Sequence, residues 1–163
     1  MLSAAGLLDA SFREPSLDYV DLIKATRLMC GVDEAKKLVR RALFNYVTVN
    51  QDDHSKNFSF LANDKDEWQL SPCYDIVYSP SSYGEHMTAF NGNGAYPDKR
   101  ALEQMAGQAG FANSKPLYHM LDEIYQQTRN FKTEAKGLGL SAGLIKTIEN
   151  DIAERARNVR PNA

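Results

Sequence analysis

The feature that most constrains the fold of this chain is a polar series at residues 50–57, which directly follows a largely apolar run at residues 43–49. Carboxylates, an imidazole, an ammonium group and an amide stand side by side in this series. An ordinary solvated helix face would instead mix charged residues with helix formers. The pattern therefore predicts a buried helix that leads into a tight polar turn, which we call the polar loop (residues 50–57).

Two short runs of β-forming residues follow the polar loop, at residues 58–61 and 68–70, with polar residues between them. This pattern predicts a small β-hairpin, and Pro72 ends its second strand. Because a hairpin reverses the direction of the chain, we expect Asp75 to return to the neighbourhood of Asn57.

Most of the remaining chain shows the helical spacing of apolar residues. Residues 78–97 are rich in Ser, Gly, Asn and Pro and predict a long loop, and residues 1–12 are interpreted as the exit of an earlier element. The fold class is therefore mainly α with a small β-hairpin, in a single domain over residues 1–163. The predicted helices cover residues 16–30, 33–46, 98–107, 114–137 and 141–156, with N-caps at Ser16, Asp33, Asp98, Ser114 and Ser141.

Composition and charge argue against several classes of protein. The net charge of −2 gives no reason to expect nucleic-acid binding through bulk electrostatics. The two cysteines, Cys30 and Cys73, lie in unrelated contexts, which fits a reducing compartment better than a disulfide framework. No apolar run approaches the roughly 18 residues that span a bilayer. We therefore expect a cytoplasmic protein that does not associate with a membrane.

The polar loop and the returning segment carry the groups that phosphoryl transfer needs. Asp52 is the candidate catalytic base, which would orient a substrate hydroxyl or accept its proton. Asn57, through its amide oxygen, and Asp75 are the candidate ligands of Mg²⁺, which completes its shell with water and nucleotide phosphates. His54 and Lys56 are candidates for contacting the phosphates of ATP or for orienting the loop.

Each polar residue also has a purely structural interpretation. An aspartate five residues before an asparagine is common by chance, and for the spacing alone an acidic turn that caps the following strand is the better explanation. The buried helix before it, the hairpin after it and the Tyr-Asp-Ile segment at residues 74–76 shift the weight toward a functional site. Asp53 is interpreted as a solvated or capping residue, because crowding a second carboxylate against Asp52 is costly. Cys73 is interpreted as a buried structural thiol, and His86 and His119 as histidines without a chemical role.

Residues 52–59 resemble the catalytic loop of the HipA-type kinases, the toxins of bacterial toxin–antitoxin pairs, in which Asp-x-His-x-Lys-Asn is followed by a serine. Residues 70–76 resemble the metal-binding segment of that family. The resemblance implies the kinase-like, helical C-terminal lobe of a serine/threonine kinase that uses ATP and Mg²⁺. It assigns Asp52 as the catalytic aspartate, and Asn57 and Asp75 as the metal ligands.

The resemblance also implies partners. A HipB-like helix-turn-helix antitoxin would bind the protein, and operator DNA would be reached only through that antitoxin. The substrate would be a protein, such as an aminoacyl-tRNA synthetase. The Asp-x-His-x-x-Asn spacing from Asp52 to Asn57 is also similar to that of phosphoinositide-type kinases, which leaves the substrate class open.

The sequence departs from complete kinases in two ways. Eukaryotic-type protein kinases have His-Arg-Asp and Asp-Phe-Gly where this chain has Asn-Gln-Asp at residues 50–52 and Asp-Ile-Val at residues 75–77. No glycine-rich loop or strand lysine is found before the polar loop. We therefore expect a C-terminal lobe without its N-terminal lobe, with little or no kinase activity by itself.

Two other readings stay open. A kinase-derived lobe could serve as a non-catalytic module that binds an antitoxin or another protein. A metal-dependent hydrolase could be built on Asp52, His54 and Asp75, although such sites usually have further histidine or carboxylate ligands.

Overall fold

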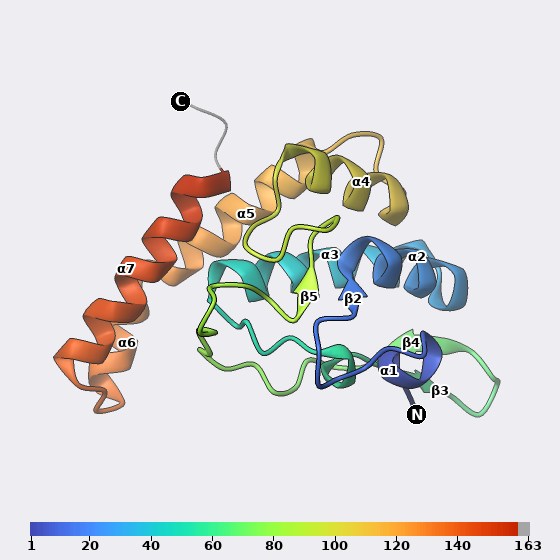
Figure 1. Ribbon diagram of the computed structural model, residues 1–163, viewed down its shortest axis with the longest axis horizontal. Coiled ribbons are helices and arrows are strands. Elements are labelled where there is room, and N and C mark those ends of the chain that lie inside the picture. Colours follow the sequence, from blue (N-terminus) through green and yellow to red (C-terminus); the bar gives the residue numbers. More distant parts are fainter. Residues whose placement is uncertain (160–163) are drawn as a thin grey trace.

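The computed structural model describes residues 1–159, and the predicted single domain extends four residues beyond them. Helices dominate this part of the chain, and the β-structure is limited to short strands (Figure 1). The predicted fold class, mainly α with a small β-hairpin, is thus confirmed. The elements are β1 (Leu2–Ser3), α1 (Ala4–Leu7), β2 (Leu17–Asp18), α2 (Tyr19–Cys30), α3 (Val32–Val47), the 3₁₀ turn η1 (Ser55–Asn57), β3 (Ser59–Ala62), β4 (Trp68–Leu70), β5 (Thr88–Ala89), α4 (Lys99–Ala109), α5 (Lys115–Thr128), α6 (Phe131–Gly137) and α7 (Ala142–Val159).

Helix α3 lies at the centre of the molecule, in contact with α2, α4, α5 and α7 (Figure 1). Its apolar residues recur at helical spacing on a face wide enough to meet several neighbours. The helix therefore acts as the core element whose C-terminal end carries the polar loop. Its buried apolar side chains are Ala35, Leu38, Val39, Ala42, Leu43, Tyr46 and Val47.

The predicted hairpin is present and gains a third strand. Strands β3 and β4 pair antiparallel, with Phe60 opposite Leu70. Strand β1 pairs antiparallel with the other edge of β3, with Leu2 opposite Phe60. Residues 1–12 therefore pack on this domain, and the backbone N–H of Ala4 also donates to the carbonyl of Phe58 at 2.8 Å.

Helix α2 begins later than the sequence predicts. Its N-cap is Asp18, whose side chain accepts from the backbone N–H of Val20, and Ser16 instead donates to the carbonyl of Ser11. The reason is that Leu17 and Asp18 pair with β5 as a parallel strand, so the chain is extended at the predicted first turn. Similarly, α3 is capped by Gly31 and not by Asp33, which lies in its first turn.

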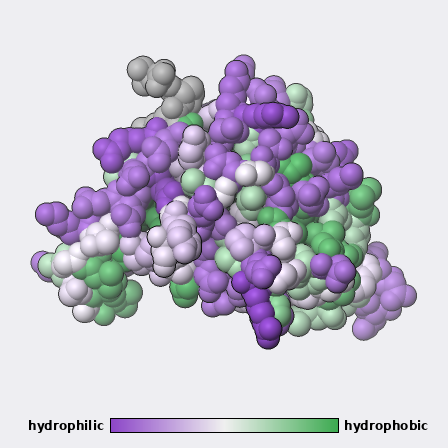
Figure 2. All heavy atoms as spheres, viewed as in Figure 1, coloured by the Kyte–Doolittle hydropathy of each residue, from purple (hydrophilic) through white to green (hydrophobic). Residues whose placement is uncertain are grey.

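The predicted helix over residues 114–137 is two helices. Helix α5 ends at Thr128 and α6 begins at Phe131, and the change of direction between them allows α6 to pack against α7. The predicted N-caps of the neighbouring helices are correct: Asp98 accepts from the N–H of Ala101 at 2.7 Å, and Ser141 from that of Leu144 at 3.3 Å. The face in Figure 2 is mostly hydrophilic, with apolar side chains showing at the α6 end and at the opposite end, on the side of α2 and α1.

The predicted long loop before α4 is held to the rest of the molecule. The N–H of Ser79 donates to the carbonyl of Val49 at 3.0 Å, and the N–H of Met87 to that of Gln51 at 3.1 Å. Strand β5 then pairs with β2. The loop therefore lies along the polar loop. No helix within residues 1–159 is long and apolar enough to cross a membrane.

Candidate functional site

The polar loop begins with a sharp change of direction at Val49. This residue has a φ of 57°, in the left-handed region that β-branched residues avoid. Such a conformation costs roughly 1–3 kcal/mol and persists only where the surroundings impose it. Here the N–H of Asn50 donates to the carbonyl of Asn45 at 2.9 Å, which closes the end of α3 and directs the chain into the loop.

Asp52 and Asn57 are in direct contact. The Nδ2 of Asn57 donates to the backbone carbonyl of Asp52 at 2.8 Å, across the 3₁₀ turn η1. The backbone N–H of Asp52 donates to the Oγ of Ser79 at 3.2 Å. Both backbone groups of Asp52 are therefore held while the residue itself is exposed. The amide nitrogen of Asn57 is thus used internally, which leaves its amide oxygen as the candidate metal ligand.

The segment after the hairpin, residues 71–79, is attached to Gln51 at the start of the polar loop and to Ser59 just after its end, and we call it the return segment. At its start, the N–H of Ser71 donates to the carbonyl of Ser59 at 2.8 Å. At its end, the carbonyl of Ser79 accepts from the N–H of Gln51 at 3.2 Å. The return segment must therefore run alongside the polar loop, as the predicted hairpin requires.

Asp75 lies in the middle of the return segment, exposed and with a φ of 54°. Its neighbour Tyr74 ties this region to the polar loop: the Tyr74 hydroxyl donates to the carbonyl of Lys56 and lies 2.6 Å from the Oγ of Ser59. The structure thus brings the segment of Asp75 beside the residues that surround Asn57.

His54 and Lys56 both contact Phe12, which the sequence analysis leaves without a role. The Nζ of Lys56 lies 3.2 Å from the centre of the Phe12 ring, and the ring of His54 meets Phe12 edge-on at 6.3 Å. A cation over an aromatic face is attracted by the ring quadrupole. The Oγ of Ser55 holds the same N-terminal segment by donating to the carbonyls of Ala10 and Ser11.

The interpretation of Asp53 as a solvated or capping residue is wrong. Its side chain is fully buried and accepts from the Tyr19 hydroxyl at 2.6 Å, the Thr88 N–H at 3.2 Å and the His86 Nδ1 at 2.8 Å. Burial, with the Asp53 charge adding to it, raises the pKa of Tyr19 well above its ordinary value. Asp53 is therefore a buried structural acceptor, and His86 is its partner.

The structure also places Cys73 and His119, two residues that the sequence analysis left without a chemical role. Cys73 is exposed in the return segment, so the expectation of a buried structural thiol is wrong. The sequence signal for this exposure was Pro72, which ends β4 and leaves the following residues outside the sheet. His119 is exposed on α5, away from the polar loop in the chain.

A family model described as the HipA-like C-terminal domain matches residues 1–134. The chain belongs to this family. The matched part of the HipA-like domain contains the polar loop and the return segment and ends inside α6. No curated protein is similar enough in sequence to count as a relative.

A solved structure has the same fold as this HipA-like domain. It is the complex of HipA, HipB and operator DNA of the toxin–antitoxin system of Shewanella oneidensis MR-1, with a TM-score of 0.66 and 20% sequence identity. The similarity covers 88% of this chain and 36% of that chain. The HipA-like domain thus spans about a third of the length of the protein that it resembles.

The protein itself offers only some of the ligands that a magnesium ion needs. Within residues 1–159, no group of three or more His, Cys, Asp or Glu side chains lies together as a metal site. Asn57 can offer its amide oxygen and Asp75 its exposed carboxylate, both hard oxygen donors. Mg²⁺ commonly takes one or two protein oxygens together with substrate phosphates and water, so a donor set of this size and kind is compatible with that ion.

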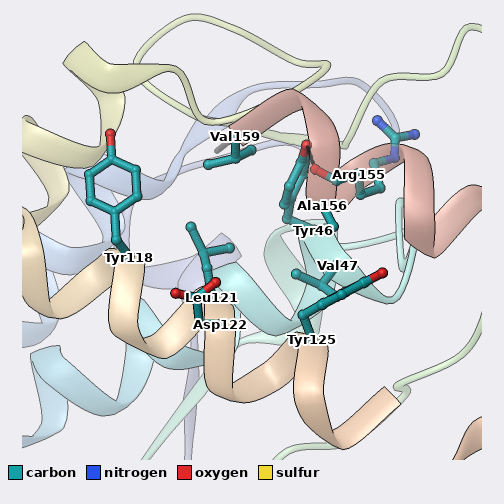
Figure 3. Close-up of a pocket in the computed structure, with 9 residues that line it drawn as sticks. All are labelled: Tyr46, Val47, Tyr118, Leu121, Asp122, Tyr125, Arg155, Ala156 and Val159. Carbon is teal, nitrogen blue, oxygen red and sulfur yellow. Dashed lines mark hydrogen bonds between the residues drawn. The ribbon is translucent and has the colours of Figure 1, made fainter. Parts of the chain in front are cut away.

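A cavity elsewhere in the HipA-like domain is too small for a nucleotide. It lies between α3, α5 and α7 and has a volume of about 30 Å³, room for a water molecule (Figure 3). It includes none of the candidate site residues, and the Tyr46 hydroxyl closes it by donating to the carbonyl of Arg155 at 2.9 Å. Its lining residues are Tyr46, Val47, Tyr118, Leu121, Asp122, Tyr125, Arg155, Ala156 and Val159.

Proposed function

We propose that the HipA-like domain is the catalytic lobe of a protein serine/threonine kinase, which transfers a phosphoryl group from Mg-ATP to a protein hydroxyl. The observation that carries the proposal is the double attachment of the return segment to the polar loop. The return segment that carries Asp75 runs alongside the polar loop, in which Asn57 holds the backbone of Asp52. This supports the proposal, because phosphoryl transfer requires a base and metal ligands in one region.

In this proposal Asp52 acts on the substrate hydroxyl. Its residue is exposed and its backbone is fixed at both the N–H and the carbonyl, so the carboxylate is presented to solvent from a rigid support. A carboxylate in this position orients the attacking hydroxyl and accepts its proton as the new bond to phosphorus forms.

Asn57 and Asp75 would hold the magnesium ion. The ion would supply positive charge that neutralises the charge developing on the transferred phosphoryl group. Lys56 and His54 would contact phosphate oxygens from the same loop. Because the Lys56 ammonium group lies on the Phe12 ring, it would have to exchange this contact for a phosphate.

The partners follow from the same proposal. The similar HipA was solved with HipB and operator DNA. We propose that this chain likewise binds a HipB-like helix-turn-helix antitoxin in the cytoplasm, and that it reaches DNA only through that antitoxin, in keeping with its net charge of −2. Its substrate would be a protein, with an aminoacyl-tRNA synthetase as the first candidate to test.

Titration with Mg²⁺ and a nucleotide tests the metal site without relying on activity. We expect Asp75→Asn to weaken Mg-nucleotide binding by at least tenfold, because the amide lacks the negative charge that the ion requires. Asp66→Asn is the matched control, since Asp66 is also exposed and also has a positive φ, of 59°, but lies in the turn of the hairpin. Calorimetry measures the affinity, and Mn²⁺ in place of Mg²⁺ should broaden the NMR signals of residues near Asn57.

Equal affinity for the wild-type chain and Asp75→Asn would reject the metal role of Asp75. If neither protein binds Mg-nucleotide, the non-catalytic binding module becomes the better description of this chain.

A further inference from the structure

We infer that Ser79 is a positioning residue of the site: its hydroxyl connects a buried chain of hydrogen bonds, which starts at the Asp53–His86 pair, to the backbone N–H of Asp52. The inference deepens the proposed function, because it concerns the residue that directs the candidate base. It also assigns a role to Asp53, the buried neighbour of that base, as the interior end of this chain of hydrogen bonds.

The chain begins in the fully buried interior. The side chains of Asp53 and His86 are both 0% exposed, and the Nδ1 of His86 lies 2.8 Å from the Oδ2 of Asp53. The Tyr19 hydroxyl donates to the same Oδ2 at 2.6 Å. Thr88 adds a second attachment, because its Oγ1 donates to the backbone carbonyl of Asp53. The residue after the candidate base is therefore fixed through both its side chain and its backbone.

Polar side chains then lead from Tyr19 back to the polar loop. The Nδ2 of Asn45 donates to the Tyr19 hydroxyl at 3.0 Å, and the Nδ2 of Asn50 donates to the Oδ1 of Asn45 at 3.1 Å. All three side chains are buried. Each amide uses its nitrogen toward one neighbour and its oxygen toward the next, which orders the series in one direction.

Ser79 is the last member and leaves the interior. Its hydroxyl has one proton, which it donates to the Oδ1 of Asn50 at 3.0 Å, with the carbonyl of Val77 as a more distant acceptor at 3.3 Å. The oxygen accepts from the backbone N–H of Asp52 at 3.2 Å. Because the Asp52 carbonyl already accepts from Asn57, the bond to the Ser79 hydroxyl means that both backbone groups of Asp52 are hydrogen-bonded.

The arrangement is more than ordinary packing. A buried polar network costs more than an apolar core of the same shape, and the cost is greater here because the buried Nε2 of His86 has no hydrogen-bond partner within residues 1–159. In this network the outermost link reaches the backbone of the one exposed aspartate in the polar loop. The geometry therefore points to Ser79 as the link between the rigid interior and the direction of the Asp52 carboxylate.

Amide hydrogen exchange on the full chain tests the inference directly. We expect Ser79→Ala to raise the exchange rate of the Asp52 N–H by at least tenfold, since its acceptor is lost. Ser79→Thr keeps the hydroxyl and should restore the wild-type rate. Ser81→Ala is the matched control: its hydroxyl donates to the Glu85 carbonyl and accepts from the Glu85 N–H, within its own turn.

A binding measurement separates positioning from a general loss of structure. Ser79→Ala should leave the affinity for Mg-nucleotide within twofold of the wild-type value, because Asn57 and Asp75 remain in place, whereas a general loss of structure would lower it. Ser79→Cys gives the same test with a side chain of similar size, should the alanine variant be unstable.

Unchanged exchange at Asp52 in Ser79→Ala, or an equal increase in Ser81→Ala, would overturn the inference. A wild-type chain that binds no Mg-nucleotide would reject the proposed function instead, and the exchange rates would still decide whether Ser79 supports Asp52.

Discussion

Asp52 and Asp53 are neighbours with the same side chain and opposite environments. Asp52 is exposed, whereas Asp53 is fully buried. One of the two faces the interior because Tyr19, His86 and Thr88 bond to the Asp53 carboxylate there. The sequence could not indicate which one, because Tyr19 and His86, the partners that make burial acceptable, lie 34 and 33 positions away.

The two aspartates should therefore respond differently to truncation. We expect Asp53→Ala to lower the free energy of unfolding by roughly 3 kcal/mol, because it leaves buried donors without their acceptor. Asp52→Ala should change it by less than about 0.5 kcal/mol, as exposed sites usually do. Urea denaturation measures both, and equal losses of stability would contradict the buried role of Asp53.

At the scale of elements, the sequence predicted helices well and short strands poorly. Helices α2, α3, α4 and α7 carry a periodic apolar face over 11 residues or more, and a local capping residue marks α4 and α7. Strands β1, β2 and β5 have two residues each, too few to show an alternating pattern. They exist only because distant segments meet, which the sequence does not display locally.

The late start of α2 leads to a prediction about its cap. We expect Asp18→Ala to lower the free energy of unfolding by about 1–2 kcal/mol, because Asp18 caps the helix and also accepts from the N–H groups of Asn91 and Gly92. Ser16→Ala should be close to neutral, since Ser16 does not cap the helix. Thermal unfolding measures the stability of both variants. A larger loss of stability in Ser16→Ala than in Asp18→Ala would support a helix that begins at Ser16.

For the whole molecule, the candidate site is assembled from segments that are far apart in the sequence. The motif spacing correctly suggested that Asp52 and Asn57 belong together and that the hairpin returns the chain. It could not show that residues 1–12 cover the polar loop, because the contacts of Phe12 and Ser55 depend on β1 joining the sheet. Local patterns predict the parts, and only tertiary contacts bring Phe12 to Lys56.

The buried tyrosines predict how the molecule responds to alkaline pH. Burial raises the pKa of Tyr19 and Tyr46 well above the ordinary value, and burial with the hydrogen bond to Asp151 raises the pKa of Tyr78 to about 12. The unfolded chain, with tyrosine pKa values near 10, releases these protons first. The stabilisation is therefore complete below about pH 10 and is lost as the pH rises toward the folded-state pKa values.

Denaturation between pH 8 and 11.5 measures this loss. We expect the free energy of unfolding to fall above about pH 10, and Tyr19→Phe to remove up to about 1.4 kcal/mol per pH unit from that slope. Tyr83→Phe is the control, because Tyr83 is 91% exposed. The same slope in wild type and Tyr19→Phe would contradict the assignment to Tyr19.

The hydrogen bonds that converge on Asp53 also constrain how this protein can change over time. Because Tyr19 and His86 both hydrogen-bond to the Asp53 carboxylate in the interior, losing Asp53 leaves two buried groups without their acceptor. A second substitution that converts the site to apolar packing should then lower the free energy of unfolding by less than the first one did. Homologous chains are accordingly expected to keep or replace these three residues as a group, so that they covary although the sequence separates them widely.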